Sequence, residues 1–318
     1  MFFHRSTSLG NDEEGWKKSS ATCPAWIQTL FHRIGLLYGI LSAITLGLQF
    51  CFARILQDKF PSDQIMFFRS IFMYVLLPQI SWQLASEHDS MDLLLYILYG
   101  IFNVAGLYIS YLALNFTNVG NVNAIAINLT IPTAILGNFF LGEEVGVVKF
   151  VMLFINLVGV TLIANPSVLF SKGSVTVNDF YGGCLAFVAL ISMTLSRITA
   201  RKSALRVKMD ASLMTLMSGA VGVPFCLSIL MFSSWAMPSA LWDWFNIASY
   251  VLLSLFANQF AMRGVEYESA CNISALTSLS VPLAYIVGLF YLKDDFKVIS
   301  IVGATLVVGS TFLSLLGT

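Results

Sequence analysis

Charged residues are scarce in this sequence. Of its 318 residues, 57% are hydrophobic and only 11% are Asp, Glu, Lys or Arg. Soluble domains carry about 25% charged residues, so most of this surface must face something other than water. The formal net charge is zero, which removes any electrostatic basis for binding nucleic acid. The composition therefore predicts a protein of the lipid bilayer with no nucleic-acid partner.

Motifs for enzymes and metal sites are also missing. The five cysteines are scattered and form no CxxC or Cys/His spacing, so we interpret them as small hydrophobic residues. The sequence contains no HExxH, GxSxG or Walker A loop, and Asp294-Asp295 is a lone acidic pair at a helix end. We therefore predict that the protein is not an enzyme and has no metal or cofactor.

The first 33 residues are polar and carry charges of both signs, among them Asp12 and Lys18. They lack the apolar core and the small-residue cleavage site of a signal peptide. We expect residues 1–33 to form a disordered cytoplasmic tail outside the fold.

Long apolar runs fill the rest of the chain. A helix needs about 20 mostly apolar residues to cross about 30 Å of hydrocarbon. These runs are continuously apolar instead of alternating with a period of two, which favours helices over a β-barrel. The sequence thus predicts an all-α membrane protein with ten transmembrane helices, over residues 34–56, 64–84, 93–114, 119–141, 146–164, 180–200, 211–233, 240–262, 269–292 and 297–316.

Lys and Arg are unevenly distributed between the predicted loops. With the N-terminus in the cytoplasm, ten of the 17 lie on the inner side and four in the outer loops. The basic run from Arg201 to Lys208 is then a topology signal. We expect a multi-pass protein of the plasma membrane or an endomembrane, with both termini cytoplasmic.

The two halves of the sequence are related. A shift of 150 residues places Pro132 on Pro282 and Gly159 on Gly309 without a gap. Each copy has five spans, an odd number, so the second copy must cross the membrane in the opposite sense. Inverted repeats of this kind underlie many secondary transporters. We predict two inverted five-helix repeats, over residues 34–164 and 180–316.

Charged side chains inside the predicted spans are few, and each is a candidate site because burying charge in hydrocarbon is costly. Arg54 and Arg197 lie near span ends and can extend to the interface. Arg69 lies about 8–9 Å down the second span. It either binds an anionic solute or pairs with a polar group of another helix, and both interpretations stay open. No Asp or Glu lies convincingly mid-span, which favours an anionic or neutral polar solute over a cation.

Amide and phenol side chains recur in the spans. Either they line a wet cavity, or they form hydrogen bonds between helices that each contribute about 0.6 kcal/mol. Pro132 and Pro282 interrupt the backbone ladder in mid-helix and are candidate hinges of gating helices. The candidate solute-binding residues are Arg69, Asn103, Tyr111, Asn121, Asn128, Asn258 and Gln259.

Several motifs resemble those of a known family. Three segments resemble parts of an EamA domain. They are Met66–Ser70 at the start of the second span, Thr130-Ile131-Pro132 with Leu141-Gly142-Glu143 in the fourth span, and Gly303–Leu306 in the tenth. The chain is similar over residues 34–316 to the drug/metabolite transporter superfamily, and most of all to the G branch of solute carrier family 35. One departure is Lys293-Asp294, where the first copy has Glu143-Glu144.

The resemblance implies a cavity enclosed by spans 1–4 and 6–9, with spans 5 and 10 outside, and transport by alternating access. Two function hypotheses remain. The first is a secondary transporter for a small organic solute, with an organic anion favoured by Arg69. The second is a non-transporting regulator or scaffold that binds a partner protein through the tail or the basic run from Arg201 to Lys208. A homodimer is left open.

Overall fold

All regular structure that the computed structural model describes is helical. Seven helical segments among the described residues are long and apolar enough to cross a membrane, namely Ile34–Gln57, Met91–Ala113, Phe180–Arg206, Ala211–Leu230, Leu241–Tyr267, Ala270–Phe290 and Val298–Leu315. The prediction of an all-helical, multi-pass membrane protein is thereby confirmed, whereas the number of ten spans stays a prediction. The structure describes residues 25–76, 90–116, 122, 125–126, 128–143, 145–164, 177–206, 210–231, 235–292 and 298–316.

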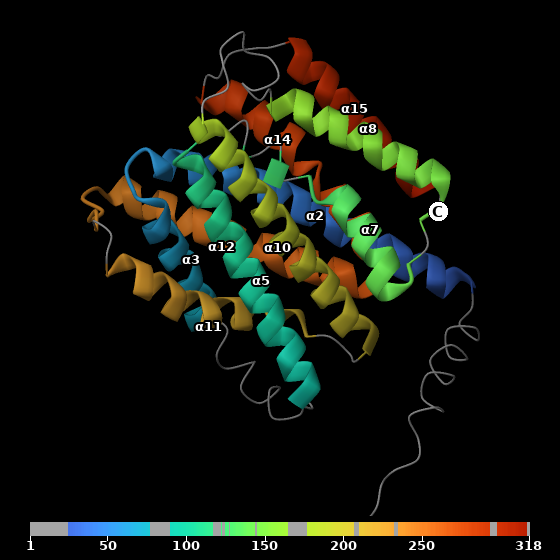
Figure 1. Ribbon diagram of the computed structural model, residues 1–318, viewed down its shortest axis with the longest axis horizontal. Coiled ribbons are helices and arrows are strands. Elements are labelled where there is room, and N and C mark those ends of the chain that lie inside the picture. Colours follow the sequence, from blue (N-terminus) through green and yellow to red (C-terminus); the bar gives the residue numbers. More distant parts are fainter. Residues whose placement is uncertain are drawn as a thin grey trace, which may run out of the picture.

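The helices follow the predicted spans in chain order (Figure 1). The first half contains α2 (Ala25–Gln57), α3 (Ser62–Leu76), α5 (Ser90–Leu114), α7 (Thr130–Leu141) and α8 (Val147–Ala164). The second half contains α10 (Val177–Arg206), α11 (Ala211–Leu230), α12 (Leu241–Tyr267), α13 (Ala270–Thr277), α14 (Ser280–Val287), the π-helix η1 (Gly288–Leu292) and α15 (Val298–Leu316).

Helix α2 begins earlier than predicted. Its first residue is Ala25, whereas the first span was expected from residue 34. The sequence explains the difference, because Trp26, Ile27 and Leu30 continue the apolar residues at helical spacing. Residues 1–24 of the expected tail lie outside the described residues.

Two of the predicted spans are interrupted. In the fourth span the chain is not helical at Asn128–Leu129, directly before α7, and in the ninth it turns at Ser278–Leu279, between α13 and α14. The two residues of each break lie four and three residues before a proline, which is Pro132 in the first copy and Pro282 in the second. Proline has no N–H for the carbonyl four residues earlier, and its ring clashes with that carbonyl. The breaks therefore fall at matched positions of the two copies because the prolines do.

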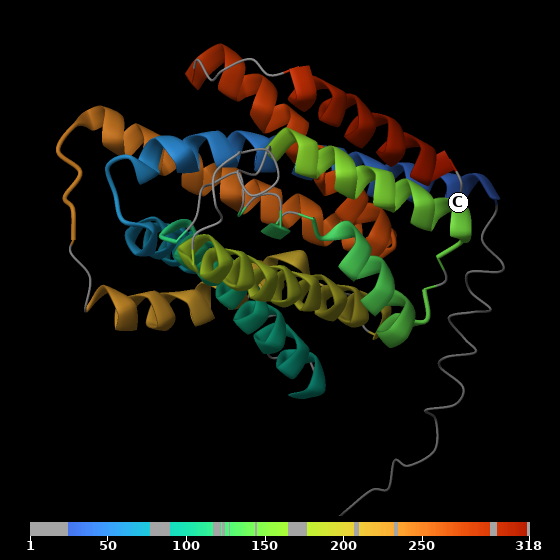
Figure 2. The same cartoon turned by 45° about the horizontal axis from the view of Figure 1, so that its top comes forward.

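The tightest packing joins helices from opposite halves of the chain. Helix α2 packs on α12, α5 on α10, α8 on α15 and α3 on α11, while α7 contacts α13 less extensively. Exchanging the two halves converts this set of pairs into itself, so that α2–α12 becomes α10–α5. Helices α8 and α15 lie side by side at one edge of the molecule in both views (Figures 1 and 2). The two copies thus build the core between them.

Two glycines allow the close approach of α8 and α15. A Cβ atom added to Gly303 would lie 2.6 Å from the carbonyl oxygen of Gly159, and one added to Gly159 would lie 2.8 Å from that of Gly303. Both distances are too short for any side chain, so glycine is required on each helix. Val160 and Val307, both buried, complete this contact.

Candidate solute site

Three polar side chains form a stripe along α12. Tyr250, Ser254 and Asn258 are spaced four residues apart, so they lie on one face of the helix at intervals of about 6 Å. All three are buried. Tyr250 bonds to α5, Ser254 to α3, and Asn258 to both α5 and α11, so this α12 stripe links three other helices.

Asn258 connects both halves of the chain. Its Oδ1 accepts a hydrogen bond of 2.9 Å from the hydroxyl of Tyr99 on α5, and its Nδ2 donates one of 3.0 Å to Oγ1 of Thr215 on α11. The Tyr99 hydroxyl in turn accepts a hydrogen bond of 3.1 Å from Nδ2 of Asn103. Such bonds fix the relative position of α5, α11 and α12, because each partner would otherwise be a buried polar group without compensation.

Arg69 contacts the middle of the α12 stripe. The side chain is 4% exposed, and its Nε donates a hydrogen bond of 2.6 Å to Oγ of Ser254. No carboxylate in the part of the chain that the structure describes forms an ion pair with it. A guanidinium stays protonated in proteins. The site therefore carries a buried positive charge that no described acidic side chain neutralises.

The structure brings four of the predicted binding residues into this network. Arg69 bonds to the α12 stripe, and Asn258 is part of it. Asn103 bonds to Tyr99, and the hydroxyl of Tyr111 lies 3.1 Å from that of Tyr250. These contacts locate the residues without testing whether they bind a solute.

The other candidates lie elsewhere. Gln259 is half-buried and is turned by about 100° from Asn258 around α12. Asn128 is 3% exposed and occupies the break before α7, while Asn121 lies outside the described residues. Pro132 is the third residue of α7, and Pro282 is the third residue of α14.

Sequence reasoning missed Tyr99, Thr215, Tyr250 and Ser254. The two on α12, Tyr250 and Ser254, could have been found from their spacing of four with Asn258, since polar side chains that recur once per turn in an apolar helix must face protein or water. Thr215 carries no such signal, because a hydroxyl in an apolar helix usually bonds its own backbone. Thr215 does this as well, donating to the carbonyl of Ala211 at 2.9 Å.

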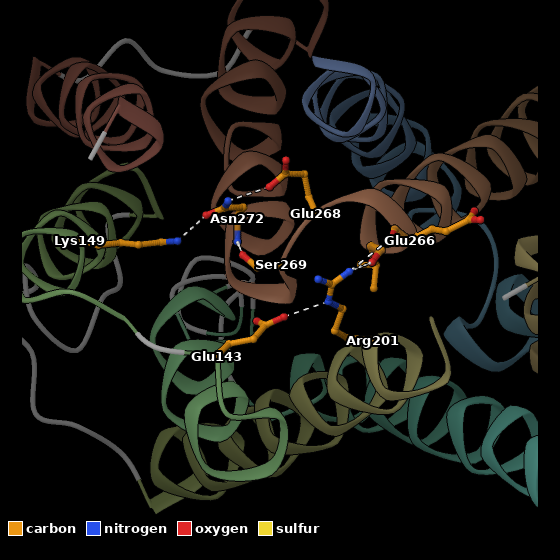
Figure 3. A network of polar contacts seen from close by, with 8 residues as sticks. Glu143, Lys149, Arg201, Glu266, Glu268, Ser269 and Asn272 are labelled. Atoms are coloured by element: carbon orange, nitrogen blue, oxygen red, sulfur yellow. Dashed lines mark hydrogen bonds and ion pairs between the residues drawn. The ribbon is translucent and has the colours of Figure 1, made fainter. Parts of the chain in front are cut away.

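One end of the bundle is closed by polar contacts between the two copies (Figure 3). Arg201 of α10 donates from Nε to Oε1 of Glu143 at 2.9 Å, and from Nη1 to the carbonyl of Val265 at 2.7 Å. Beside it, Nζ of Lys149 donates to Oδ1 of Asn272 at 2.6 Å. We call this group of contacts the Arg201 end.

A carboxylate completes the Arg201 end. Nδ2 of Asn272 donates to Oε2 of Glu268 at 2.9 Å, so the amide lies between an ammonium and a carboxylate (Figure 3). Lys149, Asn272 and Glu268 are 8%, 5% and 6% exposed. Buried charges are tolerated when they are paired and hydrogen-bonded. Here Asn272 on α13 bonds to the ammonium of Lys149 on α8 and to the carboxylate of Glu268, so it bridges the two charges.

The opposite end has its own contacts between the copies. Nζ of Lys59 lies 2.6 Å from Oδ1 of Asp243, and Gln64 exchanges two hydrogen bonds with the backbone of Ala236, at 2.6 and 3.1 Å. Asp243 and Glu268 lie at the two ends of α12, which at 1.5 Å per residue separates them by about 37 Å. We call this the Lys59 end.

Two of the ion pairs occupy matched positions in the copies. Lys59 follows the first helix of its copy and pairs with Asp243 at the start of α12. Arg206 ends the first helix of the second copy and lies 3.4 Å from Asp92 at the start of α5. A basic residue at or just after the end of the first helix of each copy thus contacts an acidic residue in the first turn of the third helix of the other copy.

These features define a class of protein. It is a helical membrane protein built from two repeats in one chain, with a cationic polar site between them. The comparison with known families identifies it further. The EamA-like transporter family matches residues 33–165 and, separately, residues 180–316. Because the two matches cover most of the chain, this protein belongs to that family, whose members are transporters of the drug/metabolite transporter superfamily and not enzymes.

A solved structure supports the same fold. The protein described as "Crystal structure of protein" superposes with a TM-score of 0.69 at 13% sequence identity, covering 89% of this chain and 99% of that one. At this identity the likeness concerns the fold alone. No curated protein matches the chain.

Proposed function

We propose that this protein is a secondary transporter that moves a small organic anion across a membrane by alternating access. The observation that carries the proposal is Arg69, a buried guanidinium at the interface of the two copies, bonded to a neutral serine. A charge in this setting is costly unless a ligand neutralises it at some stage of the cycle. A carboxylate or phosphate group fits the planar fork of a guanidinium.

The halves are proposed to be inverted repeats of five spans each, over residues 34–164 and 180–316. The exchange symmetry of the helix pairs, the matched helix breaks and the matched ion pairs all support this relation. In an inverted arrangement, swapping the conformations of the copies moves the opening from one side to the other. With both termini cytoplasmic, the Arg201 end faces the cytoplasm and the Lys59 end faces outwards.

In this mechanism the contacts at the two ends alternate. Opening toward the cytoplasm separates Arg201 from Glu143 and Lys149 from Asn272, while the Lys59 end stays closed, and opening outwards does the reverse. The helix breaks at Pro132 and Pro282 are the hinges, because a helix without continuous backbone hydrogen bonds bends there at the lowest cost. Asn128, at one break, and Asn121 remain candidate binding residues.

The neutral network around Arg69 would orient the solute. Asn103, Tyr111 and Asn258 present amides and hydroxyls that donate to an anion without adding charge. The resemblance to the G branch of solute carrier family 35 accords with a small organic solute and does not define it. In the proposed function, Arg69 supplies affinity and the neutral groups supply selectivity.

Uptake by proteoliposomes tests the proposal. Purified protein should take up at least one labelled organic anion with saturation, and the Arg69→Gln variant should lose at least tenfold in kcat/KM while its thermal unfolding stays cooperative. Arg263→Gln is the matched control, because Arg263 is exposed and lies 6.0 Å above the ring of Tyr38. Full anion uptake by Arg69→Gln would remove Arg69 from the site. Wild-type vesicles without saturable flux of any anion would favour the regulator or scaffold hypothesis.

A further inference from the structure

The cations within the helix bundle, which are buried or half-buried, differ in how their charge is neutralised. Arg201 has Glu143, and Lys149 has Glu268 through the amide of Asn272. In contrast, Arg69 and Arg197 form no ion pair with any acidic residue that the structure describes. Arg69, which is buried, and Arg197, which is half-buried, thus carry two positive charges that no described carboxylate neutralises, one from each copy.

Arg197 lies deeper in the bundle than its sequence position suggests. The sixth span was expected to end at residue 200, which would let Arg197 extend to the interface, but α10 continues to Arg206. On α10, Met193 packs against Gly106, and Ala200 packs in the same buried cluster as Tyr99. Arg197 lies between these two contacts, so it faces α5 at the level of the polar network.

The guanidinium of Arg197 has a hydrogen-bond donor available for a ligand. Its Nη1 is buried and has no hydrogen-bond partner among the described residues. Arg201, one helical turn further along the same face, uses its nitrogens on Glu143 and on the carbonyl of Val265. A buried donor without a partner costs free energy, and in native proteins such groups mark strain, a functional role, or a place for water or an ion.

Arg69 and Arg197 both influence the hydroxyl of Tyr99. Both guanidinium groups interact electrostatically with the hydroxyl of Tyr99. It is also bonded to Asn258, one turn along α12 from Ser254, which accepts the hydrogen bond from Arg69. Two like charges that both act on one hydroxyl also repel each other, and the repulsion grows as the local dielectric falls.

We infer that Arg197 is a second anion-binding residue and that the site takes a solute with two negative charges, carried either by two carboxylates or by one phosphate. This inference rests on the proposed function and adds the charge of the solute to it. A monoanion would neutralise one arginine and leave the other uncompensated, whereas a dianion neutralises both. Because Arg69 belongs to the first copy and Arg197 to the second, the solute also joins the two copies.

Direct binding of three matched anions tests the inference. Binding of succinate, butyrate and inorganic phosphate is measured by isothermal titration on the purified full-length protein. Succinate and butyrate share a four-carbon chain and differ by one carboxylate. Wild-type protein should bind succinate at least tenfold more tightly than butyrate, and comparison with phosphate shows whether two carboxylates or a phosphate is preferred.

The variants separate the two arginines. In Arg197→Gln the tenfold preference should shrink to about twofold with butyrate binding retained, whereas Arg69→Gln should lose both ligands. Arg197→Lys, which keeps the charge, should retain the preference for the dianion. Lys202→Gln, an exposed neighbour on α10, is the control and should match wild type.

The two proposals fail in distinguishable ways. Equal affinity of the wild type for succinate and butyrate would overturn the inference about Arg197, even if no variant folds, and would leave anion transport intact. An unchanged preference in Arg197→Gln would overturn it as well. If the wild-type protein binds none of the three anions, both the proposed function and this inference are wrong.

Discussion

Replacing Glu143 with glutamine should loosen the Arg201 end of the protein. Glutamine has the same shape but no charge, so Arg201 keeps its hydrogen bond to the carbonyl of Val265 and loses the ion pair with Glu143. A hydrogen bond between charged groups contributes about 1.5–3 kcal/mol. Both side chains are 15–17% exposed, and solvent screening places this pair near the lower value. About 1.4 kcal/mol corresponds to a tenfold change in an equilibrium constant.

Hydrogen exchange measures this opening directly. When local opening and closing are fast, the exchange rate of a backbone amide is proportional to its opening equilibrium. We therefore expect Glu143→Gln to accelerate exchange about tenfold in a peptide covering residues 265–272, measured in nanodiscs. That segment holds Val265, Glu268 and Asn272, the partners of the Arg201 end in the second copy.

A second ion pair between the copies supplies the control. Arg206 lies 3.4 Å from Asp92 and its side chain is 50% exposed, so the pair contributes only about 0.2–1 kcal/mol. Arg206→Gln should change exchange in residues 265–272 by less than about threefold. The reasoning is refuted if Glu143→Gln changes exchange by twofold or less, or if both variants have the same effect.

Two further predictions concern packing and the helix breaks. Gly303→Ala should destabilise the protein by about 1–3 kcal/mol, because its Cβ would lie 2.6 Å from the carbonyl oxygen of Gly159, whereas Gly309→Ala, with nothing within 4 Å, should be neutral or slightly stabilising. Denaturant unfolding in mild detergent checks both, and equal stabilities would contradict the close contact between α8 and α15. Pro282→Ala should restore the backbone hydrogen bond to Ser278 and raise the unfolding temperature, while turnover in proteoliposomes falls. A variant as active as wild type would show that the break is not a hinge.

The sequence predicts the elements well because each follows from local composition. Apolar runs of about 20 residues are sufficient to locate helices, and the prolines at 132 and 282 mark where two of them break. What sequence reasoning did not foresee is that regular helix is interrupted at Asn128–Leu129 and at Ser278–Leu279, although Leu129, Ser278 and Leu279 keep right-handed helical dihedral angles. A proline kinks or breaks a helix according to its neighbours, and those are set by tertiary packing.

The candidate site was predictable only in part. Arg69 and Asn258 stand out because charge and amides are rare in apolar helices, and both lie in the polar network. Their partners Ser254 and Tyr99 do not stand out, since a serine or tyrosine is acceptable almost anywhere in a span. Arg197 was misplaced because the end of a helix is the least certain feature of a hydropathy reading, and α10 extends to Arg206.

Counterflow in proteoliposomes tests the central claim most directly. Vesicles that contain wild-type protein are preloaded with an unlabelled organic anion and diluted into a trace of the labelled compound. A carrier that exposes Arg69 to one side at a time should accumulate label transiently above equilibrium, and uptake should be faster than in empty vesicles. Label that only equilibrates, at a rate independent of preloading, would contradict alternating access.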